Sequence, residues 1–264
     1  MLVKNIIITG SGQCGETFFY NLFKNNNKIE AFDETRPTIS AYYKFIKYNK
    51  INIDDEPFFK LIWNDLKKTK KKGKIRLETS SYLSLHIDEF YRKFGSKIII
   101  LMRNPYDVAF SLSSKGWYKK RYILKNKKKI IGYQGVSTNA NNKHHNFSRI
   151  SPKGAYFQKW NKFTPLLKVK WYWNEIYKEI FKLLNKIPKK NYKIIKIEDF
   201  SYKDYLMLSK WIGIKPDISE FFFNLKLKII KKGYKDKKKK LKEFSKFKSV
   251  IEKKFYKENI HKKL

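Results

Sequence analysis

Residues 2–24 read LVKNIIITGSGQCGETFFYNLFK and contain the pieces of one folding unit. The apolar run 2–9 ends at Gly10 and is typical of a buried strand in a parallel sheet. Residues 16–24 then carry apolar side chains at the spacing of one helix face. The segment between these two runs is rich in glycine. We therefore expect a strand, a glycine loop and a helix.

The alternation of strand and helix continues along the chain. We expect further strands at 74–78, 97–102 and 192–197, and helices at 40–48, 57–68, 82–94, 106–114 and 202–212, with one or two more helices over 153–186. Strands that alternate with helices form a parallel sheet. The pattern predicts an α/β fold with a P-loop-type parallel sheet and helices on both faces.

Two segments depart from this alternation. Residues 115–152 lack periodicity and are rich in Lys, Asn, Gly and Ser, which indicates a variable lid or acceptor loop. Residues 217–264 form a Lys-rich helical tail, with 237–240 as a solvated charge run. Because no repeat or Pro- or Gly-rich linker divides the chain, we expect a single domain over 1–264 with a helical C-terminal extension.

The chain of 264 residues is strongly basic, with 61 Lys and Arg against 23 Asp and Glu and a formal net charge of +38. Only six of the basic residues are Arg, which phosphate and base recognition favour over Lys. We therefore favour codon bias over nucleic-acid binding as the origin of the Lys excess. The charge still favours anionic partners, such as phosphate or sulfate esters, polyanionic glycans and anionic membrane surfaces.

Targeting segments and metal ligands are not evident in the sequence. No apolar run reaches the roughly 18 residues that a membrane span requires, so we expect a cytoplasmic protein. The single cysteine, Cys14, excludes an intrachain disulfide and a Cys-based zinc cluster. His144 and His145 have no partners at ligand spacing, and no metal is expected.

The glycine loop has the spacing of a phosphate-binding loop. Residues 10–17 read GSGQCGET, and a loop between strand and helix can bind an anion through its backbone N–H groups. Glu16 stands where a nucleotide-binding P-loop has lysine, and its carboxylate would repel a γ-phosphate. The strand at 97–102 is followed by Arg103 instead of the acidic residue of an ATPase. An ordinary glycine turn remains the alternative.

Arg103 begins a second motif. Residues 103–111 read RNPYDVAFS, and Arg103 and Ser111 can bind one phosphate together. With the glycine loop, this stretch resembles the cofactor motifs of sulfotransferases that use 3′-phosphoadenosine 5′-phosphosulfate (PAPS), a 5′-phosphosulfate loop and a 3′-phosphate motif R-x-P-x-D-x-x-x-S. KIEDF at 196–200 resembles a further family segment, and the resemblance covers about residues 3–213.

The resemblance implies a donor site without a metal. Arg103 and Ser111 would bind the 3′-phosphate, and the 5′-phosphosulfate would contact the loop residues Gly12, Gln13, Cys14, Gly15, Glu16 and Thr17. The loop departs from the family pattern, because Gln13 replaces a basic residue, Cys14 a Ser and Glu16 a Thr. Gln13 would act in catalysis by donating a hydrogen bond to the departing phosphate, but it cannot neutralise that charge, and Glu16 adds negative charge nearby.

The segment Glu34-Thr35-Arg36 resembles the E-T-R stretch of tyrosylprotein sulfotransferases, whose Glu is the base. This resemblance implies that Glu34 is the catalytic base and that Arg36 orients it or holds the transferring group. The alternative is that Glu34 caps the next segment. Glu78 begins a stretch that resembles glycan sulfotransferases, whereas His86 is expected on a helix as an exposed or core histidine.

These patterns predict a PAPS-dependent sulfotransferase that transfers a sulfuryl group to a hydroxyl or amine acceptor. A glycan, a glycolipid and a tyrosine-like phenol remain open as acceptors. The alternatives are a P-loop nucleotide kinase or ATPase and a non-catalytic basic protein that binds nucleotide or nucleic acid. The aromatic residues Trp171, Trp173 and Phe181 are expected to form a core stripe and not an adenine platform.

Overall fold

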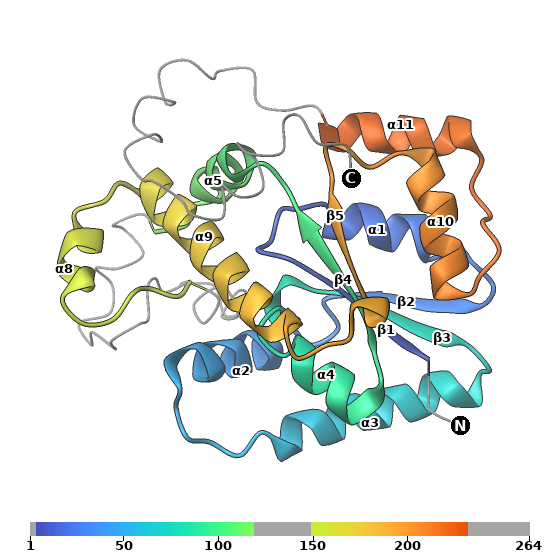
Figure 1. Ribbon diagram of the computed structural model, residues 1–264, viewed down its shortest axis with the longest axis horizontal. Helices are drawn as coiled ribbons and strands as arrows, with labels where there is room; N and C mark the ends of the chain where they lie inside the picture. Colours follow the sequence, from blue (N-terminus) through green and yellow to red (C-terminus); the bar gives the residue numbers. More distant parts are fainter. Residues whose placement is uncertain (1–3, 119–148, 232–264) are drawn as a thin grey trace.

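The computed structural model describes residues 4–118 and 149–231, and within them the chain forms one parallel sheet (Figure 1). The strand order is β2-β3-β1-β4-β5, and every neighbouring pair is parallel. The strands are β1 (Asn5–Thr9), β2 (Ile29–Asp33), β3 (Ile75–Thr79), β4 (Lys97–Met102) and β5 (Tyr192–Lys196). The predicted α/β class is confirmed, because the strands alternate with helices along the chain.

The edge strand β2 is the element that the sequence analysis missed. Only Ile29 of this strand is buried, and its other residues are exposed or half-buried. The strand therefore has no continuous apolar run that would distinguish it from a loop. It pairs with β3 from Ile29 opposite Ile75 to Asp33 opposite Thr79, and this pairing brings the segment after Asp33 to the same edge as the glycine loop.

Helices cover both faces of the sheet. Figure 1 shows α1, α10 and α11 on one side of the strands, and α2, α3 and α4 on the other. The bounds are α1 (Glu16–Phe23), α2 (Pro37–Asn49), α3 (Glu56–Lys71), α4 (Ile87–Phe94), α5 (Pro105–Ser114), α8 (Tyr156–Asn161), α9 (Pro165–Leu184), α10 (Tyr202–Ile212) and α11 (Glu220–Lys231). Ser201 and Asp204 form a capping box at the start of α10, as such a pair does in stable helices.

One predicted helix differs in detail from the structure observed. The expected helix at 82–94 is a 3₁₀ turn, Ser81–Leu83, followed by α4, and His86 is the residue before α4. The side chain of Ser80 accepts a hydrogen bond from the Tyr82 N–H and stabilises the turn. Over 153–186, where one or two helices are expected, the chain forms two, α8 and α9, because Thr164 and Pro165 begin a new helix.

Helix α9 holds the glycine loop against the core. Trp171 and Trp173 are buried, as expected for a core stripe, while Phe181 is partly buried against the same core. The Tyr172 hydroxyl donates to the Ser11 carbonyl at 3.0 Å, and the Tyr177 hydroxyl donates to the Leu101 carbonyl at the end of β4. Both hydroxyls thus connect α9 to the edge of the sheet where β1 and β4 end.

The lid expected at 115–152 falls largely on residues 119–148, outside the described part, as do His144 and His145. Of the Lys-rich tail at 217–264, α11 is helical, and 232–264 including the charge run 237–240 are not described. The single domain over 1–264 stays a prediction. Within the described residues, none of the helices has the length and apolar character to cross a membrane.

Candidate functional site at the carboxyl edge of the sheet

The candidate site is built by the loops that follow β1, β2, β3 and β4. Because all strands are parallel, their carboxyl ends meet at one edge, where α/β proteins bind ligands. The glycine loop at 10–15 lies at the centre of this edge, since β1 is the middle strand. The predicted site residues from distant parts of the sequence are therefore brought to one edge.

The glycine loop has the backbone of an anion-binding turn. Gly12, Gln13 and Gly15 all have positive φ angles, of 93°, 58° and 105°, and Gly15 is the residue before α1. Turns in which such residues alternate with right-handed ones direct successive backbone N–H groups toward one concave point. Gly10 must be glycine for a different reason, because a Cβ there would lie 2.5 Å from the Leu101 carbonyl oxygen.

The Cys14 side chain faces the core and not the concave side of the loop. It is fully buried, and its Sγ lies 3.2 Å from both the Ser11 hydroxyl and the Tyr177 hydroxyl. Burial, helped by the Glu16 carboxylate, raises the pKa of the thiol to about 12. Of the polar groups of Cys14, only the backbone N–H is therefore placed to contact an anion in the loop, and the predicted role of Cys14 in donor binding stays a prediction.

The Glu16 side chain folds back onto the loop. Its Oε2 accepts a hydrogen bond from the Cys14 N–H at 2.8 Å, and its Oε1 is buried without a partner among the described residues. Burial raises the pKa of this carboxyl, and the backbone N–H groups of Glu16, Cys14 and Gly12 oppose the rise. The carboxylate thus lies among the N–H groups that a bound phosphate would use.

Gln13 joins the two predicted anion-binding motifs. The Ser111 hydroxyl donates to the Gln13 side-chain oxygen at 3.0 Å, and an Arg103 Nη donates to the Gln13 carbonyl at 3.3 Å. Asn104 caps α5, with its side chain accepting from the Tyr106 N–H at 2.9 Å. Two hydrogen bonds therefore connect residues that lie about ninety positions apart in sequence.

Glu198 supports the Arg103 motif from the segment after β5. Its carboxylate accepts a hydrogen bond from the Asn104 N–H, at the start of α5. Burial raises the pKa of Glu198, while the Asn104 N–H and the Arg103 charge lower it. The sequence resemblance includes this glutamate, but its contact with the turn after Arg103 becomes evident only in the structure.

Glu34 lies at a strained position beside the loop. It is not glycine, yet its φ is 53°, and its N–H donates to the Thr79 carbonyl at 2.9 Å. Burial, with the charges of Glu16, Asp33 and Glu78, raises the pKa of Glu34 to about 7. A carboxylate with a pKa in this range can accept a proton near neutral pH.

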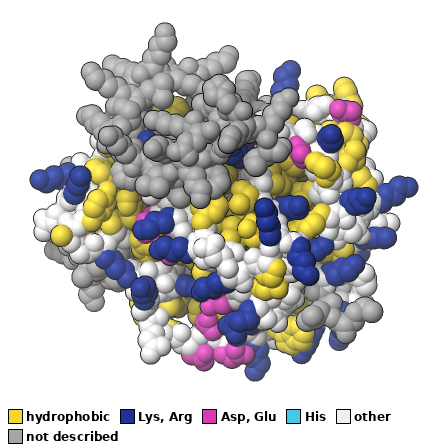
Figure 2. Space-filling model, viewed as in Figure 1, with side chains coloured by type: hydrophobic (Ala, Val, Ile, Leu, Met, Phe, Trp, Pro, Cys, Tyr) yellow, Lys and Arg dark blue, Asp and Glu magenta, His cyan; other side chains and the backbone are white. Residues whose placement is uncertain are grey.

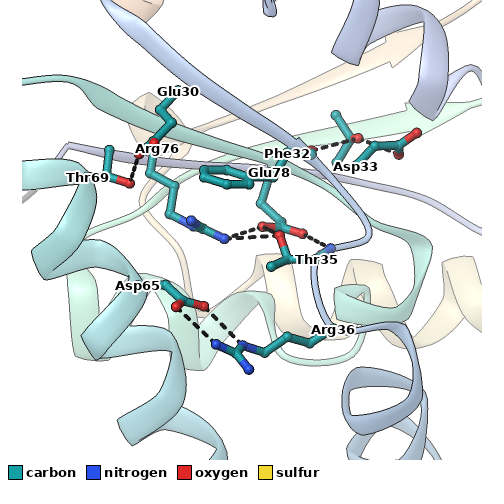
Figure 3. Close-up of polar contacts among 10 residues, drawn as sticks. Glu30, Phe32, Asp33, Thr35, Arg36, Asp65, Thr69, Arg76 and Glu78 are labelled. Atoms are coloured by element: carbon teal, nitrogen blue, oxygen red, sulfur yellow. Dashed lines mark hydrogen bonds and ion pairs between the residues drawn. The ribbon is translucent and has the colours of Figure 1, made fainter. Parts of the chain in front are cut away.

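Glu78 holds the segment that carries Glu34 (Figure 3). Its carboxylate accepts from the Thr35 N–H at 2.8 Å, from the Thr35 hydroxyl at 2.6 Å and from Arg76 at 2.6 Å. Both side chains of the Arg76–Glu78 pair are almost fully buried. Because two of these three hydrogen bonds come from Thr35, Glu78 fixes the position of the turn at 34–36.

The Arg36 guanidinium is turned toward α3 (Figure 3). Its Nε and one Nη each donate to Asp65 at 3.0 Å, and this bidentate contact accounts for the hydrogen bonds of its side chain. It makes no hydrogen bond to Glu34 in the described residues. Arg36 therefore does not orient Glu34 by direct contact. The predicted role of Arg36 in holding a transferring group stays a prediction.

Thr17 and His86 lie outside the centre of the site. Thr17 is exposed, and its hydroxyl donates to Asp33 at 3.4 Å. His86 is 1% exposed, packs against Phe58, and has its Nδ1 2.7 Å from Glu89. Of the two expected placements of His86, exposed or in the core, the structure shows the core, and His86 precedes α4 instead of lying on a helix.

Sequence reasoning missed Lys44 on α2. This lysine is fully buried, and its Nζ donates to the Ser81 carbonyl at 3.0 Å and to the Tyr172 hydroxyl at 3.1 Å. Burial lowers the pKa of Lys44 to about 7, against the opposing charges of Glu16 and Glu34. In a chain this rich in lysine, no local sequence signal distinguishes Lys44 from its neighbours.

Metal ligands do not gather at this edge. Within 4–118 and 149–231, no three His, Cys, Asp or Glu side chains are grouped as metal ligands would be.

Comparison with family models gives no match, and comparison with curated proteins gives none either. Among solved structures, the chain is similar in fold to a sulfotransferase domain from the curacin biosynthetic pathway, with a TM-score of 0.51 and 12% identity over 89% of this chain and 79% of that chain. The chain therefore has the fold of a sulfotransferase domain, as its sequence motifs predicted.

Two further solved structures are similar. A sulfotransferase from Alicyclobacillus acidocaldarius has a TM-score of 0.48 and 15% identity over 89% of this chain and 98% of that chain. A sulfotransferase domain from the Synechococcus PCC 7002 olefin synthase has a TM-score of 0.49 and 13% identity over 94% of this chain and 84% of that chain.

Proposed function

We propose that the protein is a PAPS-dependent sulfotransferase that transfers a sulfuryl group to a hydroxyl or amine acceptor. The main support for the proposal is that the two predicted anion-binding motifs contact each other. Ser111 and Arg103 of one motif both donate hydrogen bonds to Gln13 of the other. One motif fits a 5′-phosphate and the other fits a 3′-phosphate. A nucleotide with both groups is therefore the ligand that this edge of the sheet fits best.

The residues of the glycine loop fit the phosphosulfate end of such a donor. The left-handed turn at Gly12, Gln13 and Gly15 directs N–H groups to one point, and the N-terminus of α1 adds to their field. The unpartnered Glu16 Oε1 lies at the same place, so the Glu16 carboxylate has to leave this position when an anion binds. When bound, the donor supplies the sulfuryl group and leaves as adenosine 3′,5′-bisphosphate.

Glu34 is the proposed catalytic base. Its carboxylate accepts the proton of the acceptor hydroxyl while the acceptor oxygen bonds to sulfur and the bond from sulfur to the 5′-phosphate oxygen breaks. The raised pKa of Glu34, about 7, suits a group that must take up a proton near neutral pH. Glu78 contributes by fixing Thr35, the residue after Glu34.

The alternatives find less support in the described residues. In a nucleotide kinase or ATPase, the Glu16 carboxylate would lie where the P-loop lysine normally acts. On the face shown in Figure 2, Lys and Arg side chains are scattered over the described surface, with hydrophobic and other side chains between them. This face therefore lacks the gathered basic side chains that nucleic-acid-binding proteins place on their binding face.

Thermal unfolding with different nucleotides tests this function. We expect adenosine 3′,5′-bisphosphate to raise the melting temperature, because a ligand that binds only the folded state stabilises it. ATP with Mg²⁺ is expected to do less, since it lacks the 3′-phosphate that Arg103 and Ser111 would contact. Equal stabilisation by the two nucleotides would argue against the sulfotransferase proposal and favour the kinase or ATPase alternative.

A further inference from the structure

Lys44 places a buried ammonium group next to the glycine loop. Its side chain is 0% exposed, and its Nζ donates to the Ser81 carbonyl and to the Tyr172 hydroxyl. The same hydroxyl donates to the Ser11 carbonyl, so two hydrogen bonds connect Nζ to the loop. Ser81 is also close to the loop, since a Cβ on Gly12 would lie 3.5 Å from its hydroxyl.

The charge of Lys44 has no direct counterion among the described residues. Its two hydrogen-bond acceptors are neutral, and an ammonium group has three N–H donors. Glu16 and Glu34 act on Lys44 only at longer range, and both favour its charged form. A buried cation that lacks a paired anion is unfavourable. The arrangement becomes favourable when an anionic ligand supplies the missing partner.

The glycine loop lacks the positive charge that such a ligand requires. Its neutral Gln13 stands where the sulfotransferases that the sequence resembles have Arg or Lys. We infer that Lys44 binds the 5′-phosphosulfate end of the donor and supplies the cation that position 13 does not. This inference rests on the proposed function, and it assigns to α2 a binding role that the sequence motifs do not include.

The test compares two nucleotides that differ at one end. Calorimetric titration with adenosine 3′,5′-bisphosphate and with adenosine 3′-monophosphate is performed on the wild type and on Lys44→Met. We expect the variant to lose about tenfold or more in affinity for the bisphosphate, because one charge-assisted contact is removed. Affinity for the 3′-monophosphate should not change, since this ligand has no 5′-phosphate.

Lys47→Met is the matched control. Lys47 lies on the same helix, but its Nζ is paired with Asp88 at 3.1 Å and with Glu89. This control should bind both nucleotides as the wild type does. If Lys44→Met does not fold, Lys44→Gln, which keeps a donor for the Ser81 carbonyl, is titrated in its place.

A second variant tests whether charge is what Lys44 supplies. Adding Gln13→Arg to Lys44→Met returns a cation to the loop and should restore most of the lost bisphosphate affinity. Unchanged bisphosphate binding in Lys44→Met, or equal losses for both nucleotides, would overturn the Lys44 assignment alone. A wild type that does not distinguish the bisphosphate from the 3′-monophosphate would overturn the proposed function as well.

Discussion

The Glu16 carboxylate accepts a 2.8 Å hydrogen bond from the backbone N–H of Cys14, two residues earlier in the chain. This contact places a negative charge of the protein itself in the turn that is shaped for an anion. Burial raises the pKa of Glu16, because it disfavours the charged form of the carboxyl. The loop thus contains a group that competes with the ligand proposed for it.

Removing this charge should strengthen anion binding. Glu16→Gln keeps the shape of the side chain, and we expect it to bind adenosine 3′,5′-bisphosphate several-fold to about tenfold more tightly. Glu220→Gln, at an exposed glutamate at the start of α11, controls for the change in net charge. Calorimetric titration of both variants measures the effect. Weaker binding by Glu16→Gln would mean that the carboxylate organises the loop and does not compete with the ligand.

The proposed base makes a separate prediction about turnover. Glu34→Gln should reduce sulfuryl transfer by roughly 10²–10⁴-fold while nucleotide affinity stays nearly constant, because the amide cannot accept the proton. Since the pKa of Glu34 is about 7, transfer by the wild type should rise as the pH increases through 7, and the variant should lose this rise. The profile is measured at saturating donor, because the bound anion then keeps Lys44, whose own pKa is about 7, in its charged form. The charged groups that act on Glu34 are Glu16, Asp33, Glu78 and Lys44.

The assay for Glu34 requires an acceptor that the wild type modifies, found with labelled PAPS and a panel of phenols, sugars and glycolipids. Glu30→Gln is a suitable control, because Glu30 lies on β2, the strand that precedes Glu34, but its carboxylate is bound by Thr69 and Lys72. Wild-type turnover by Glu34→Gln on such an acceptor would exclude Glu34 as the base.

The Arg76–Glu78 pair predicts a large effect on stability. Arg76→Met leaves the Glu78 carboxylate buried without its cation, so the free energy of unfolding should fall by about 3–5 kcal/mol. Arg92→Met, at an exposed position on α4, should change it by less than about 0.5 kcal/mol. Denaturant unfolding followed by circular dichroism compares the variants. If Arg76→Met lowers the free energy of unfolding by no more than Arg92→Met does, the hydrogen bonds from Thr35 alone are enough to stabilise the buried Glu78 carboxylate.

The sequence predicts the sheet well where strands are buried on both faces. The strands β1 and β4 appear as apolar runs, because neighbouring elements cover both of their faces. The edge strand β2 does not appear as an apolar run, since only its Ile29 is buried. The pairing of β2 with β3 depends on residues far away in sequence. Local periodicity contains no information about such a pairing.

The candidate site is predicted only in part for a similar reason. Spacing within a motif identifies Gln13, Arg103 and Ser111, and the structure brings these three residues together. Lys44 and Tyr172 come from α2 and α9, and only packing unites them beside the loop. The direction of the Arg36 side chain is likewise determined by a distant residue, Asp65.

The most direct test of the central claim is the affinity for adenosine 3′,5′-bisphosphate relative to adenosine 5′-monophosphate, measured by calorimetry in the wild type and in Arg103→Ala. We predict that the wild type prefers the bisphosphate and that Arg103→Ala loses about 1.5–3 kcal/mol of bisphosphate binding, with little change for the monophosphate. Equal wild-type affinity for the two nucleotides, unaffected by Arg103→Ala, would contradict the account of this site as a PAPS site.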